Sequence, residues 1–203
     1  MTTARRFDTR DIARIAVFAA ILAALGLVAP IPLPGLVPIT AQTLGVMLAG
    51  TVLGAWRGAA AVVVFEVLVL IGLPLLSGGY GGAGSFADPA SGYLLGWIPG
   101  AFVTGAIAHA GRGRMRWWRV ALGALVGGVL VVYAIGIPVQ AAYTGLPLGG
   151  TALSSLIFLP GDLVKAAVAT LLTMVLVRAY PPVFGARGTR AIVADADAAS
   201  DDR

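Results

Sequence analysis

Asp162 and Lys165 are the residues of this chain best suited to do chemistry, because they are ionisable groups at the start of an apolar segment. They lie in Phe158-Leu-Pro-Gly-Asp-Leu-Val-Lys165, and a spacing of three brings both charges to one face of a helix. Ionisable groups at membrane depth are costly and usually face a cavity, a partner or a ligand. Two interpretations follow: an ion pair that joins two helices, or a small-molecule site in which Lys165 takes a carboxylate.

Three other polar side chains are candidates for the same site. Thr40 and Gln42 begin an apolar segment, where they either cap a helix or hydrogen-bond a polar ligand. Tyr93 opens another segment, where it either belongs to the interfacial aromatic belt or contacts a ligand. Glu66 lies in the middle of a third segment and must be buried, protonated or paired. No partner for Glu66 is evident, so it is left outside the predicted site.

The composition predicts an integral protein of the cell membrane. Of 203 residues, 59% are hydrophobic and only 11% are charged, whereas a soluble domain carries about 25% charged residues. The net charge of +5 would suggest nucleic acid as a partner of a soluble protein. Here the positive charges are better explained by orientation in a lipid bilayer, so no nucleic-acid partner is predicted.

The motifs of several enzyme and metal-binding classes are missing. There is no GxxxxGK[ST] loop, so the chain itself is not predicted to be an ATPase. No HExxH motif and no cysteine is present, and the single histidine, His109, is predicted to be interfacial. No serine has an evident base beside it. We therefore predict no catalytic residue, no metal and no cofactor, with a membrane enzyme as a remote alternative.

Six apolar segments are predicted to be spans, which need about 20 residues (range roughly 17–25), and the second of them is short. They are Ile12–Ala29, Thr40–Gly54, Gly58–Leu73, Ser91–Ala110, Val120–Pro138 and Leu156–Ala179. The sequence thus predicts an all-α, six-helix membrane bundle over residues 12–180. A cytoplasmic N-terminal tail (1–11) and a disordered cytoplasmic C-terminal tail (181–203) flank it. Three segments are predicted to be loops: proline-rich Pro30–Ile39, glycine-rich Ser77–Pro89, which favours a packed lid over a flexible linker, and Val139–Ser155.

Along the chain, connecting segments that contain arginine alternate with connecting segments that contain none. The arginines occur only in the N-terminal tail, the turn at Arg57, the loop between the fourth and fifth spans, and the C-terminal segment. Because positive charge marks the cytoplasmic side, both termini are predicted to be cytoplasmic. The proline-rich loop, the glycine-rich loop and the Asp162–Lys165 pair then converge on the external face, which predicts an outward-facing ligand site.

The first predicted span carries a stripe of small residues. Ala16, Ala20 and Ala24 recur every four residues, and such a stripe lets another helix approach closely. It serves either packing within the bundle or the docking of a separate membrane subunit.

Four segments in this order resemble the BioY family, the biotin-binding S subunits of energy-coupling-factor (ECF) transporters. The resemblance covers about residues 12–180. The segments are Pro38-Ile-Thr-Ala-Gln-Thr-Leu-Gly-Val-Met-Leu-Ala-Gly50, Gly72-Leu-Pro74 with the glycine-rich loop, Ser91-Gly-Tyr-Leu-Leu-Gly96 and Phe158-Leu-Pro-Gly-Asp-Leu-Val-Lys165.

The resemblance implies a six-helix S-component fold that binds biotin from outside with high affinity. It also implies that uptake depends on a transmembrane coupling subunit and two cytoplasmic ATPase subunits. By the same resemblance Asp162 and Lys165 are ligand contacts, extended to Tyr93, Gln42 and Thr40, and the alanine stripe is the docking element. Two alternatives stay open: an S subunit for another vitamin, such as thiamin or riboflavin, and a non-transport membrane scaffold.

Overall fold

The computed structural model describes residues 8–31, 37–111 and 115–179, and every regular element within these ranges is helical. The eight α-helices are α1 (Thr9–Gly26), α2 (Gln42–Leu53), α3 (Ala55–Leu70), α4 (Ser91–Ala108), α5 (Trp117–Leu125), α6 (Val132–Thr144), α7 (Leu148–Ser155) and α8 (Leu159–Ala179). Three short helices join them: η1 (Ala83–Phe86), the π-helical η2 (Val126–Val131) and η3 (Leu156–Phe158). The predicted all-α class is confirmed for this part of the chain.

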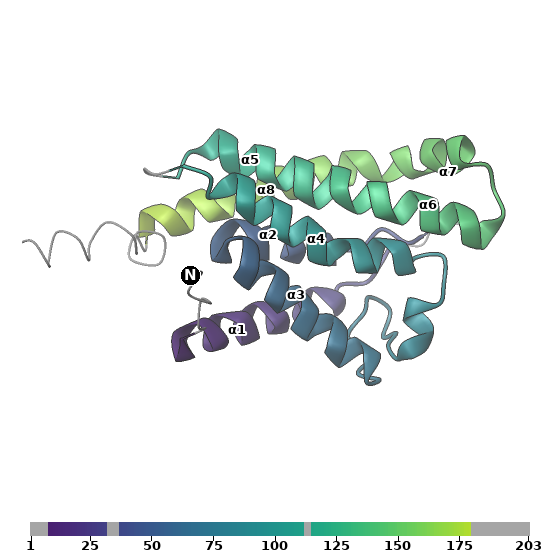
Figure 1. Ribbon diagram of the computed structural model, residues 1–203, viewed down its shortest axis with the longest axis horizontal. Coiled ribbons are helices and arrows are strands. Elements are labelled where there is room, and N and C mark those ends of the chain that lie inside the picture. Colours follow the sequence, from purple (N-terminus) through teal and green to yellow (C-terminus); the bar gives the residue numbers. More distant parts are fainter. Residues whose placement is uncertain (1–7, 32–36, 112–114, 180–203) are drawn as a thin grey trace, which may run out of the picture.

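The helices form one bundle with α4 at its centre, in contact with α2, α3, α5 and α6. In Figure 1 the start of α1 and the end of α8 lie at the same end of the bundle, and α7 lies at the opposite end. Within the described residues, three helices are long and apolar enough to cross a membrane: Ser91–Ala108, the continuous helix Trp117–Thr144 and the continuous helix Leu148–Ala179.

Close packing around α4 depends on residues without a Cβ. A Cβ at Gly105 would collide with the backbone of Gly54 and Ala55, and one at Gly127 would collide with Gly100 and Thr104. Small residues at such positions let helix backbones approach closely, which is how membrane helices gain van der Waals contact. The α4 helix can therefore touch most of the bundle.

The predicted end of the fifth span at Pro138 is wrong. The helix continues through Pro138 to Thr144 and stops only where Gly145 adopts a left-handed conformation with φ of 69°. Proline is tolerated inside membrane helices because neighbouring groups satisfy the freed backbone, whereas a left-handed glycine is a common helix end. The predicted loop Val139–Ser155 is wrong for the same reason, and most of it is helical.

The first helix also starts earlier than predicted. It begins at Thr9, whose N–H donates to the Asp8 carboxylate at 2.7 Å, and it ends at Gly26 rather than Ala29. Asp11 is 7% exposed and pairs with Arg57 of α3 at 2.9 Å. A cap and an ion pair thus extend the helix beyond its apolar run.

The other predicted spans correspond to single elements whose ends differ by a few residues. Thr40–Gly54 corresponds to α2, Gly58–Leu73 to α3, Ser91–Ala110 to α4, and Leu156–Ala179 to η3 with α8. The predicted C-terminal tail and the middle of the proline-rich loop lie outside the described residues.

Candidate ligand-binding site

A cavity of about 520 Å³ lies between α2, α4, α6, α8 and the glycine-rich segment. Its volume falls within the range of about 300–1,000 Å³ that small-molecule sites occupy. Tyr93, Trp97, Val132 and Phe158 supply apolar and aromatic surface, while Gly81, Gly84 and Ser85 of the glycine-rich segment line another part of the cavity. The glycine-rich segment therefore forms one wall of the cavity, as a packed lid would.

The first turns of α8 place Asp162 and Lys165 side by side on this cavity. The Lys165 ammonium donates to Asp162 Oδ1 at 2.9 Å and to Thr43 Oγ1 of α2 at 2.9 Å. Asp162 is only 5% exposed. The helical spacing thus brings the two charges together, as the sequence predicts, and the pair carries no net charge while both groups are ionised.

Tyr133 of α6 is a polar group of the site that sequence reasoning missed. Its hydroxyl donates to Asp162 Oδ2 at 2.6 Å, and its side chain lines the cavity. Thr43 was missed as well, although it directly follows Gln42. A tyrosine in the middle of the predicted fifth span was the available signal, but the sequence does not say which way it faces.

Tyr93 lines the cavity with its ring rather than with a free hydroxyl. The hydroxyl donates to Gln140 Oε1 at 2.7 Å and lies 3.0 Å from Ser155 Oγ. The ring meets Tyr133 edge to face, with centroids 6.2 Å apart. Tyr93 is therefore placed to pack against a ligand and to support Tyr133.

Gln42 lines the cavity, but its amide is already fully hydrogen-bonded. Its Nε2 donates to Leu22 O at 3.2 Å and to Leu75 O at 3.0 Å. Its Oε1 accepts from Ser77 N at 3.1 Å and from Ser77 Oγ at 3.3 Å. This amide ties α1 and the glycine-rich segment to α2. Thr40 also lines the cavity and is half-buried.

Glu66 is buried, at 5% exposure, as the sequence predicts. Its Oε1 has no hydrogen-bond partner among the described residues, and Glu66 does not line the cavity. The structure therefore places it away from the candidate site.

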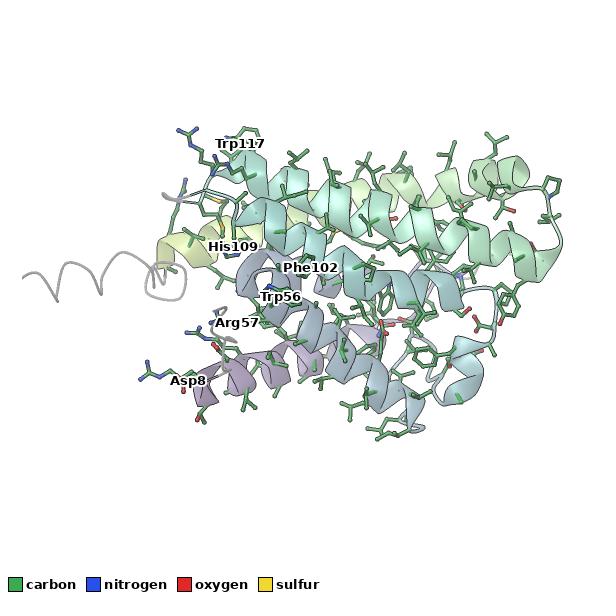
Figure 2. The ribbon with its side chains drawn as sticks, in the orientation of Figure 1. Asp8, Trp56, Arg57, Phe102, His109 and Trp117 are labelled. Atoms are coloured by element: carbon green, nitrogen blue, oxygen red, sulfur yellow. The ribbon has the colours of Figure 1, made fainter. Side chains whose placement is uncertain are left out.

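Aromatic and positively charged residues gather at the end of the bundle away from the cavity. Figure 2 shows Trp56, Arg57, His109 and Trp117 at the same end of the bundle as Asp8, with Trp117 on the opposite side of that end from α1. His109 lies at the end of α4, with its Nε2 2.8 Å from Thr51 O. Because the cavity adjoins the start of α4, this helix separates the two features.

The alanine stripe lies on the outer face of α1. Ala16, Ala20 and Ala24 are all exposed, whereas Ala19 is buried at 3% exposure. The stripe is therefore not used for packing within the described bundle.

Comparisons with known proteins agree over most of the chain. The BioY family model matches residues 1–182. The biotin transporter BioY of Rhizobium etli is 50% identical over 180 residues, which cover 86% of this chain and 96% of the relative. The biotin transporter BioY of Rhodobacter capsulatus is 45% identical over 197 residues, which cover 88% of this chain and 99% of the relative.

A solved structure has the same fold. The crystal structure of the S-component for biotin from an ECF-type ABC transporter superposes with a TM-score of 0.78 at 31% sequence identity. The match covers 87% of this chain and 95% of that chain. On the family model, the identity to these relatives and the shared fold, the chain is a membrane protein that belongs to the BioY family.

Proposed function

We propose that this chain is the biotin-binding S subunit of a biotin uptake system in the plasma membrane. The observation that carries the proposal is the cavity of about 520 Å³ with the Asp162–Lys165 pair in its wall. Membership of the BioY family and the printed names of the relatives support biotin as the ligand.

The chemistry of biotin suits this cavity. Biotin has a fused ureido-thioether ring and a valerate tail that ends in a carboxylate. An ammonium has three N–H donors, and Lys165 uses one on Asp162 and one on Thr43. We assign the third to the ligand carboxylate. Because Asp162 neutralises Lys165, this contact acts mainly as a directed hydrogen bond, while Tyr93, Trp97 and Phe158 pack against the apolar parts of biotin.

We further propose that the subunit works with a transmembrane coupling subunit and two cytoplasmic ATPase subunits. The exposed stripe Ala16, Ala20 and Ala24 supports α1 as the docking helix, because small residues permit close helix contact. Both termini would be cytoplasmic, since the described arginines lie at the end of the bundle where α1 begins and α8 ends (Figure 1), and the cavity lies at the other end.

The test is a saturation titration of the detergent-solubilised protein with radiolabelled biotin, with thiamin and riboflavin as controls. We expect saturable binding of biotin alone. Preferential binding of thiamin or riboflavin would identify an S subunit for another vitamin. Failure to bind any of the three would favour a scaffold, and chemical conversion of the bound ligand would identify an enzyme.

A further inference from the structure

A chain of hydrogen bonds joins three helices around the Asp162–Lys165 pair. It starts at the Tyr133 hydroxyl on α6, passes through both oxygens of Asp162 to Lys165 on α8, and ends at the Thr43 hydroxyl on α2. The three contacts measure 2.6, 2.9 and 2.9 Å in that order. All four residues line the cavity, so this series of hydrogen bonds fixes the polar part of the cavity wall.

Resting on the function proposed above, we propose that Tyr133 and Thr43 are positioning residues for ligand recognition. Tyr133 holds the carboxylate of Asp162, and Thr43 holds the ammonium of Lys165. Each outer residue acts through its charged neighbour, and together they leave defined donor and acceptor positions for the ligand.

The hydrogen bonds among these four residues leave several donor and acceptor positions unused. Lys165 keeps one N–H, because two of its three donors are used. Asp162 keeps one free lone-pair direction on each oxygen, since an ionised carboxylate offers about four. The Thr43 hydroxyl accepts from Lys165 and donates to no acceptor within the described ranges of the chain. A ligand therefore meets two donors beside one acceptor group in fixed places.

Without the outer residues the pair would be free to move. The Lys165 side chain is a flexible four-carbon stem with a rotatable ammonium, and an isolated i,i+3 ion pair holds its geometry weakly. Asp162 would lose the only described hydrogen bond to its Oδ2. Restraining both groups before binding reduces the entropy lost when a ligand is captured.

The orientation of Tyr133 follows from the π-helical turn just before it. In η2 (Val126–Val131) the backbone contains one residue more than an α-helix would place in the same turn. Each residue of an α-helix turns the chain by about 100°, so the extra residue rotates everything after it by about that angle. Val132 and Tyr133, which follow the turn, consequently line the cavity, and Gly128 lines it from within the turn. Such π turns are frequently found at functional sites.

Tyr93 stabilises this arrangement from the other side. Its ring packs edge to face against the Tyr133 ring, with the two ring centroids 6.2 Å apart and an interplanar angle of 85°. Its hydroxyl is held by Gln140 of α6. A Tyr133→Phe variant keeps this ring contact and removes only the hydroxyl, which makes it a clean perturbation.

The experiment is a double-mutant cycle on biotin affinity with the purified full-length chain. We compare wild type, Tyr133→Phe, Asp162→Asn and the double variant. Loss of a hydrogen bond to a charged group corresponds to about a 10-fold rise in Kd for Tyr133→Phe in the wild-type background. In the Asp162→Asn background the same change should raise Kd by less than about 2-fold, because the group it holds has already changed. Tyr143→Phe, at an exposed tyrosine, is the control.

The Lys165 arm is tested with Thr43→Val, which should raise Kd by roughly 10-fold. Thr43→Ser should restore most of the lost affinity because it returns the hydroxyl. Thr170→Val is the control, since the Thr170 hydroxyl donates only within α8, to Ala166 O.

Equal losses of affinity from Tyr133→Phe in both backgrounds would overturn the inference, because Tyr133 would then act independently of Asp162. So would failure of Thr43→Ser to rescue Thr43→Val. Either result leaves the proposed function intact as long as the wild-type protein binds biotin. If the wild-type protein binds no biotin, the proposed function itself fails, and the inference fails with it.

Discussion

Replacing Lys165 by methionine separates a binding role of the ammonium from a structural one. Methionine keeps most of the side-chain length and removes the charge together with the 2.9 Å contacts to Asp162 and Thr43. A hydrogen bond to a charged group contributes about 1.5–3 kcal/mol. The predicted rise in the Kd for biotin is therefore about 10- to 100-fold.

The same substitution also lowers stability. It leaves Asp162, which is 5% exposed, without its cation, and removing one partner of a buried pair costs about 3–5 kcal/mol. Replacing both members of a buried pair is often tolerated. The Asp162→Asn/Lys165→Met double variant should therefore regain much of the lost thermal stability while still binding biotin weakly.

The assays are saturation binding of radiolabelled biotin and thermal unfolding of the same preparations. Arg178→Met is the matched control, because Arg178 is an exposed cation at the far end of the same helix. Wild-type affinity in a stably folded Lys165→Met protein would remove Lys165 from the site. Wild-type affinity in the double variant would reduce the pair to a structural contact.

Biotin methyl ester identifies the end of the ligand that Lys165 contacts. If Lys165 binds the carboxylate, the wild-type protein should bind the ester about 10-fold more weakly than biotin, and Lys165→Met should bind both equally. Equal affinity of the wild-type protein for both ligands, lost for both in Lys165→Met, would instead assign Lys165 to the ureido ring.

Three further predictions concern residues other than the Asp162–Lys165 pair. Ala16→Leu should leave biotin affinity unchanged and abolish biotin uptake in cells that contain all subunits, because the larger side chain blocks close helix contact. Normal uptake would exclude this face of α1 as the docking surface. Gln42→Leu removes the hydrogen bonds to four groups, namely Leu22 O, Leu75 O, Ser77 N and Ser77 Oγ, and should lower stability by roughly 2–5 kcal/mol. Amide hydrogen exchange at Ser77 should become faster, and unchanged exchange there would contradict the anchoring role. Arg57→Met removes the ion-pair partner that lies 2.9 Å from buried Asp11. It should lower the thermal unfolding midpoint without changing biotin affinity. A changed Kd for biotin would link this distant end of the bundle to the site.

The helical class and the Asp162–Lys165 pair follow from the sequence because both depend on local patterns. Apolar segments of sufficient length predict helices, and a spacing of three predicts a shared face. The start of α4 at Ser91 also agrees with its predicted boundary. These features need no knowledge of how distant segments pack.

Other features depend on contacts that a linear pattern does not contain. Pro138 suggests a helix end, but packing carries the helix past it to Gly145. Tyr133 reaches Asp162 only because a π turn changes the phase of its helix, and such a turn has no reliable sequence signature. Gln42 was predicted to be a ligand contact, and its four hydrogen bonds to Leu22, Leu75 and Ser77 appear only in three dimensions.

The way the glycine-rich wall is fastened has a consequence for how a vitamin enters. Gln42 holds this wall at Ser77, and near the wall's other end the Asp88 carboxylate accepts from Ala90 N at 2.7 Å. Between these two points η1 is the only helical turn, and Gly78, Gly79 and Gly82 have positive φ. The Gly82 N–H donates to Val69 O of α3 at 2.7 Å. We therefore expect admission to need a movement of this short segment that breaks the Gly82–Val69 hydrogen bond, while the helices of the bundle stay in place. Entry should then respond to stiffening of these glycines far more than to the thickness of the surrounding bilayer.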